Sequence, residues 1–168
     1  MGKKKDYREL LKTPFDTGIR NFSAVARYFL YYAPDIDSAQ SPGIIPYEKA
    51  ESLLSELLKK TGLEGSARFL YRIQPSSWKK NDLDGFELDF EQQRFLCDKY
   101  KTETELHALL RHIRNALAHG YVFVWKKKTG NYVFFTDYDS GKNRFTAKIM
   151  VSMSILEQWK AILENEIV

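Results

Sequence analysis

Residues 111–125 read RHIRNALAHGYVFVW, and this stretch decides how the chain is organised. Up to Gly120 the apolar residues recur at the three- and four-residue steps of an amphipathic helix, and after it they follow one another as in a strand. Two of the three histidines of the chain, His112 and His119, lie on the polar side of this helix, each near an arginine. The stretch therefore predicts a helix that ends at Gly120, a strand directly after it, and a cationic cluster at the junction.

Length and composition indicate a globular chain of ordinary domain size. The chain has 168 residues, of which 43% are hydrophobic and 14% aromatic, and this is enough to bury a core. The formal charge of +4 owes much to KKK at residues 3–5, so it permits a polyanionic partner without requiring one. The single cysteine, Cys97, excludes an internal disulfide, and we expect it to be a small core residue. With no membrane-spanning run and no secretory signal, the sequence predicts a cytoplasmic protein that does not cross a membrane.

Helical patterns fill most of the chain before residue 102. Residues 17–32 carry an apolar stripe that ends before a proline, and residues 47–61 carry a leucine stripe followed by Gly62. Residues 86–100 predict a third helix, and we expect a short helix at about residues 67–71.

The fourth helix is the best defined by the sequence. Thr102 and Glu105 have the spacing of a capping box at its start. Gly120 is placed to end it in the left-handed conformation. One face of the helix is continuously apolar and is expected to be buried, and it consists of Leu106, Leu109, Leu110, Ile113 and Leu117.

The part of the chain after Gly120 has a strand-like pattern. Three stretches rich in β-branched and aromatic residues are separated by turn signals, and they predict a three-stranded antiparallel meander: residues 121–125, 131–138 and 144–151. Ser154 and Glu157 then cap a closing helix.

The predicted fold is mainly α, within the α+β class. A small three-stranded antiparallel β-meander is appended to a bundle of helices. We expect a single domain over residues 1–168, made of a helical body at about 16–120, a meander at about 121–151 and a closing helix at about 153–166.

The polar side of the fourth helix carries the candidate site. Arg114 and His119 are five residues apart, so on a straight helix they point about 140° away from each other. Either the last turn unwinds at Gly120, or a two-fold dimer brings in a second copy of the helix. Three further candidates lie on the helix, namely Arg111, His112 and Asn115.

These residue types suit the cleavage of RNA. Histidine moves protons near neutral pH, and the arginine fork matches phosphate oxygens. Because RNA carries its own nucleophile, the 2′-hydroxyl, cleavage needs only proton transfer and cations around the phosphate, without a metal or cofactor. His112 and His119 are about 10 Å apart along the helix, too far to share one metal ion. We expect His107, beside the leucine stripe, to be a structural or surface residue.

A simpler explanation remains open on spacing alone. Basic residues near the carboxyl end of a helix are favoured by the helix dipole, so Arg111, Arg114 and His119 are also compatible with a solvated helix end. An arginine a few residues ahead of a histidine is a common pattern.

The wider context of the motif is more specific. IRNALAHG, at the end of an amphipathic helix, resembles the signature of the HEPN superfamily. The helix, the strands after it and the closing helix, at about residues 102–166, are similar to the plasmid-encoded HEPN nuclease-like group. The resemblance implies a helical bundle that dimerises through the helix carrying an R-x4–6-H motif. By position, Arg114 and His119 match the motif, and Asn115 matches its polar second residue.

The resemblance also implies a function. Many HEPN proteins are metal-independent endoribonucleases of toxin–antitoxin, phage-defence and other defence systems. By analogy, Arg114 and His119 are the catalytic residues, with RNA as the substrate and a homodimer as the assembly. A neutralising antitoxin or another regulatory protein is a possible further partner. A polar residue on an early helix often completes such sites, and the choice among Arg20, Asn21 and Arg27 stays open. The alternative is a non-catalytic dimerisation or ligand-binding module.

Overall fold

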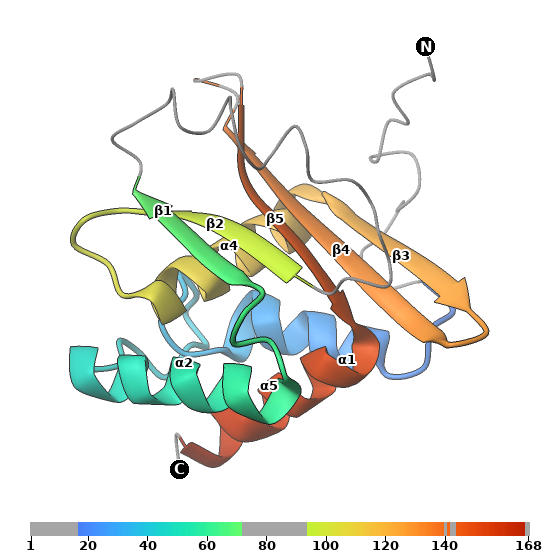
Figure 1. Cartoon of the computed structure of the whole chain (residues 1–168), viewed down its shortest axis with the longest axis horizontal. Helices are drawn as coiled ribbons and strands as arrows, with labels where there is room; N and C mark the ends of the chain where they lie inside the picture. The colour runs from blue at the N-terminus through green and yellow to red at the C-terminus, as the bar shows by residue number, and fades with distance from the viewer. Residues whose placement is uncertain (1–16, 72–93, 140, 142–143, 167–168) are drawn as a thin grey trace.

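The computed structural model describes residues 17–71, 94–139, 141 and 144–166 (Figure 1). Its helical elements are α1 (Phe22–Arg27), the π-helical turn η1 (Tyr28–Tyr32), α2 (Tyr47–Thr61), α4 (Glu105–His119) and α5 (Met153–Glu166). Its strands are β1 (Ala67–Tyr71), β2 (Arg94–Lys99), β3 (Val122–Lys127), β4 (Gly130–Asp139) and β5 (Arg144–Ser152).

The strands form one mixed sheet of five, in the order β1-β2-β5-β4-β3. The strands β3, β4 and β5 are antiparallel neighbours, as the turn signals predict, and β2 adds to them in the antiparallel direction. The strand β1 lies parallel to β2 at the edge. The prediction of a mainly α bundle with a three-stranded meander is therefore wrong, because the sheet is larger and the fold is a mixed α+β one.

Two segments predicted as helices account for this difference. Residues 67–71 form β1, and residues 94–99 of the third predicted helix form β2, while residues 86–93 lie outside the described part. The side chains of Phe95, Leu96 and Cys97 are all buried, so this strand is covered on both faces. A continuous apolar run of this length fits a buried strand as well as a helix, and its pattern alone does not distinguish the two.

The sheet carries the helices on one face (Figure 1). Alternate strand residues, such as Val133, Phe135 and Ile149, join the helix residues in one large core cluster. Their neighbours Phe134 and Met150 belong to a second, smaller cluster on the other face. The fold thus has a packed helical layer against a twisted sheet, and the site is on the helical side.

The helix α4 is buried as the sequence predicts. All five residues of its apolar stripe are at most 1% exposed. Gly120 ends the helix with φ 74°, in the left-handed region. The cap at its start is Thr104 and not Thr102, because the Thr104 hydroxyl accepts a hydrogen bond from the backbone N–H of His107 at 3.0 Å.

The closing helix α5 and the buried thiol complete the core. The helix begins at Met153, as predicted, but the hydroxyl that caps it belongs to Ser152, which accepts a hydrogen bond from the N–H of Ile155 at 3.2 Å.

Cys97 is fully buried, as predicted, and this burial raises the pKa of its thiol. Among the described helices, none has the length and apolar character needed to cross a membrane.

The first predicted helix is shorter and ends in a π-helical turn. It starts at Phe22, and the N–H of Ala33 reaches back to the carbonyl of Tyr28 at 2.8 Å. The chain then turns at Asp35, whose φ is 63°. This turn places a buried carboxylate, 4% exposed, against α4.

Candidate functional site

A groove of about 440 Å³ lies between α4 and the segment at residues 35–44. Because α4 is straight and repeats every 3.6 residues, positions three, four and seven apart share one side of it. That side lines the groove with four polar side chains, His107, Arg111, Arg114 and Asn115. The structure therefore brings three of the predicted site residues together: Arg111, Arg114 and Asn115.

Arg111 is held inside the protein. Its Nη2 and Nε donate to the two carboxylate oxygens of Glu103 at 2.7 and 3.1 Å, and Nη2 also lies 3.4 Å from Asp98 Oδ1. The guanidinium stacks 4.7 Å from the centre of the Tyr100 ring. A bidentate carboxylate pair of this kind neutralises the arginine. Arg111 therefore stabilises the loop before α4, and its charge is not available to a ligand.

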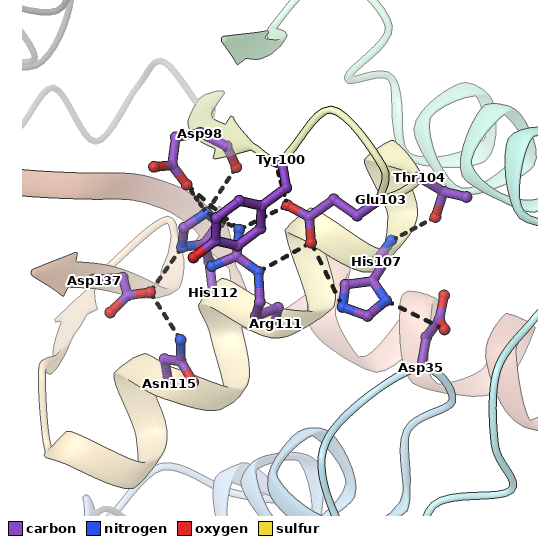
Figure 2. A network of polar contacts seen from close by, with 10 residues as sticks. All are labelled: Asp35, Asp98, Tyr100, Glu103, Thr104, His107, Arg111, His112, Asn115 and Asp137. Carbon is purple, nitrogen blue, oxygen red and sulfur yellow. Dashed lines mark hydrogen bonds and ion pairs between the residues drawn. The ribbon is translucent and has the colours of Figure 1, made fainter. Parts of the chain in front are cut away.

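His112 is buried between two carboxylates (Figure 2). Its Nδ1 lies 2.8 Å from Asp137 Oδ2, and its Nε2 lies 2.9 Å from both Oδ1 and the backbone carbonyl of Asp98. Burial lowers the pKa of this imidazole, but the bonds to Asp137 and Asp98 raise it more, and the net pKa is above the ordinary value. With no exposed surface, His112 does not line the groove.

Asp137 links this buried histidine to the groove. The register of β4 against β5 shifts between Asp137 and Tyr138, an irregularity of the kind that re-aims side chains. Burial raises the pKa of Asp137, but the hydrogen bonds from His112 and Asn115 and the charges of His112 and Arg111 lower it overall. The ionised carboxylate accepts from Asn115 Nδ2 at 3.1 Å. Because a carboxylate only accepts, Asn115 must turn its Oδ1 the other way.

The Oδ1 atom of Asn115 contacts Arg114, the arginine of the R-x4-H motif. Asn115 Oδ1 accepts from Arg114 Nη1 at 3.4 Å, a long and therefore weak bond. Arg114 is half-buried, and its Nε is buried without a hydrogen-bond partner among the described residues. A guanidinium has five N–H donors, so most of those of Arg114 remain for a ligand in the groove. Sequence reasoning did not find Asp98, because residues 86–100 were predicted as a helix, or Asp137, because it lies 25 residues from His112 in the chain.

His119 stands apart from this groove. It is exposed at the end of α4, with its ring 6.1 Å from that of Tyr121 in an edge-on arrangement. The helix is regular up to His119 and leaves its path only at Gly120. An unwound last turn therefore does not bring His119 to Arg114, and the two side chains keep about 140° between them.

The segment that follows the early helix contributes Asp35, a residue that the sequence did not single out. Arg20 and Asn21 line another cavity beside the β3–β4 turn, and Arg27 lines a third one. The early segment reaches the groove through Asp35 instead, whose Oδ1 lies 3.3 Å from Nδ1 of His107. The placement of His107 exactly seven residues before Arg114 was a signal in the sequence for a shared helix face.

The acidic and histidine side chains of the groove are paired with each other. Within the described residues, no group of three or more His, Cys, Asp or Glu side chains is arranged to hold a metal ion. The groove thus presents an arginine with available donors, an amide and an imidazole to a ligand.

Fold and site together define the class of this protein. It is an α+β chain in which an arginine and a histidine in R-x4-H spacing end a helix packed on a sheet. The family model HEPN pEK499 p136 matches residues 36–166, and the chain belongs to this HEPN family. No curated protein and no solved structure matches the chain. Family membership indicates a nuclease or nucleotide-binding function in general terms.

Proposed function

We propose that the protein is a metal-independent endoribonuclease in which Arg114 binds the scissile phosphate and His119 transfers a proton. The observation that carries this proposal is the state of Arg114. Its guanidinium lies in a groove, is oriented by Asn115, and keeps a buried Nε without a partner. Because Arg114 lines the groove, the N–H groups of its guanidinium that reach the groove would donate to a bound phosphate oxygen.

The reaction needs few groups from the protein. The 2′-oxygen of RNA attacks the adjacent phosphorus while His119 accepts the 2′-hydroxyl proton. The guanidinium of Arg114 stabilises the negative charge that builds up on the phosphate oxygens. The bond to the 5′-oxygen breaks and its electron pair goes to that oxygen, which takes up a proton, so the products are a 2′,3′-cyclic phosphate and a 5′-hydroxyl; the protonated His119 then releases the proton it accepted. DNA lacks the 2′-hydroxyl and should resist cleavage.

We further propose that the site is completed in a homodimer. On one helix Arg114 and His119 point about 140° apart, so a second copy must supply the histidine that faces a given arginine. Several large apolar side chains are exposed, namely Tyr31 (42%), Tyr32 (53%), Ile44 (86%) and Tyr47 (64%). Ile44 itself lines the groove. Exposed apolar surface of this kind is typical of an interaction face.

The test is cleavage of a mixed RNA pool in EDTA by the full chain. We expect cleavage by the wild type, and a loss of about 100-fold or more in His119→Ala and Arg114→Ala at matched dimer content. Lys59→Ala, which removes an exposed cation of α2 outside the groove, is the control and should cleave normally. Equal cleavage by His119→Ala would refute the proposal, and so would activity that EDTA abolishes.

The alternative is a non-catalytic HEPN module, and the same experiment separates it. In that case no variant cleaves RNA, and Arg114→Ala weakens the dimer instead. If the nuclease reading is correct, we also propose a role in a defence or toxin–antitoxin type of system. Induced expression should then slow cell growth for the wild type and not for His119→Ala.

A further inference from the structure

The groove beside Arg114 contains a histidine that is not part of the R-x4-H motif. Of the three histidines, His112 is completely buried and His119 lies at the exposed end of α4. His107 is the one that lines the groove, and its side chain is 33% exposed. A substrate bound to Arg114 in this groove therefore has His107 as its neighbouring imidazole.

Helix geometry places His107 and Arg114 on one side of α4. Seven residues correspond to about 10 Å along the axis and to a rotation of only about 20°. Arg111 lies between them, but its guanidinium is held by Glu103. Both side chains line the groove, so a phosphodiester chain lying along it would pass both the guanidinium and the imidazole.

The imidazole of His107 is oriented by a carboxylate (Figure 2). Asp35 Oδ1 lies 3.3 Å from Nδ1, an ion-pair contact without hydrogen-bond geometry, and the Asp35 side chain is only 1% exposed. On the other side, Glu103 Oε2 lies 3.5 Å from Nε2, a contact longer than a good hydrogen bond. Glu103 is already bound to Arg111 at 2.7 Å. The Nε2–H of His107 is therefore the group that can donate to a substrate oxygen.

The charges around His107 favour its protonated form. The contact with Asp35 raises the pKa of His107, burial lowers it, the charges of Asp35 and Glu103 raise it, and Arg111 lowers it. The net effect is a pKa above the ordinary value. A histidine whose pKa is raised beside a carboxylate keeps its proton to higher pH, which suits an acid better than a base.

We infer that His107 is a second catalytic histidine, the general acid of the reaction, an inference that rests on the proposed ribonuclease function. As the 2′-oxygen forms its bond to phosphorus, the P–O5′ bond breaks and its electron pair goes to the 5′-oxygen. That oxygen takes the proton from Nε2 of His107, while His119 holds the proton of the 2′-hydroxyl. Asp35 is then a positioning residue that keeps Nε2 directed at the substrate.

A substrate with sulfur in place of the bridging 5′-oxygen tests this role. A thiol has a pKa near 8.5, against 15.7 for water, so the sulfur leaves without needing a proton. We expect His107→Gln to cleave the normal RNA about 100-fold more slowly or worse, and the sulfur RNA within a few-fold of the wild type. His119→Ala should be slow on both substrates, because it lacks the base.

Each outcome decides the inference. If His107→Gln is as fast as the wild type on normal RNA, or equally slow on both substrates, His107 is not the acid, while the ribonuclease proposal stands. If the wild type cleaves neither RNA, the ribonuclease proposal fails and the role of His107 fails with it.

The pH profile gives a second, independent measure. Removing the charge of Asp35 should lower the pKa of His107, so Asp35→Asn should shift the alkaline limb of kcat/KM to lower pH. The control is Glu64→Gln, which removes a carboxylate from an exposed position outside the groove and should leave the limb in place. An alkaline limb that does not move in Asp35→Asn would overturn the assignment of the acid.

Discussion

The replacement of Asp137 by asparagine tests the buried network behind the groove. Asp137 is 5% exposed and accepts hydrogen bonds from His112 Nδ1 at 2.8 Å and from Asn115 Nδ2 at 3.1 Å. The substitution keeps the size of the side chain and removes its charge. The protonated His112, which has no exposed surface, is then left with Asp98 as its single carboxylate partner within the described network.

The magnitude follows from the burial of the pair. Breaking a buried ion pair by removing one partner costs about 3–5 kcal/mol, because the other charge stays buried without compensation. The amide oxygen of asparagine can still accept from Nδ1, and Asp98 remains, so we expect the lower end, about 3 kcal/mol. With a urea m-value of about 2 kcal/mol/M, this loss lowers the unfolding midpoint by about 1.5 M. It is a large part of the roughly 5–15 kcal/mol that stabilises most proteins.

The assay is equilibrium urea unfolding as a function of pH. Because the pKa of His112 is raised in the folded protein, its contribution is complete below the unfolded value near 6.5 and is lost as pH rises through the folded pKa. The penalty of Asp137→Asn should therefore be largest near pH 6 and shrink at alkaline pH. The pKa of Asp137 is lowered, so its contribution is present above the unfolded value of 3.8 and is lost as pH falls through the folded pKa.

A matched control and a refuting result complete this test. Asp37→Asn removes a carboxylate from an exposed position, where substitutions change stability by no more than about 0.5 kcal/mol. A loss below about 1 kcal/mol in Asp137→Asn, or a loss that is the same at acid and alkaline pH, would refute a charged His112 between two carboxylates.

Two further predictions concern the ends of α4. Thr104→Ala removes the side-chain cap on the N–H of His107 and should lower the free energy of unfolding by about 1 kcal/mol. Thr102→Ala is the control, and an equal loss in that variant would show that Thr102 caps the helix, as the sequence predicted. Gly120→Ala adds a Cβ at a residue whose φ is 74°, with no atom within 4 Å of that Cβ. The loss of stability is therefore conformational, about 1–2 kcal/mol. An unchanged melting temperature would contradict this prediction.

The sequence by itself determined the parts that depend on neighbouring residues. The apolar repeat of α4 and its terminal glycine fixed that helix, because helix periodicity and the left-handed cap are local properties. The strands β3, β4 and β5 were equally readable, since each turn joins two strands that pair with each other. The R-x4-H spacing of Arg114 and His119 is also a local pattern.

Tertiary structure alone decided the rest, because it depends on contacts between distant residues. The strands β1 and β2 pair across a long separation, Ala67 with Phe95, and their short apolar patterns did not distinguish strand from helix. In the sequence His112 is a candidate site residue. In the folded chain Asp98 and Asp137, which two other strands carry, lie on both sides of its ring. From the sequence, His107 is expected to be a structural or surface residue. In the folded chain the turn at Asp35 places a carboxylate beside its ring. A side chain's partners set its charge and exposure, and only the folded chain brings those partners together.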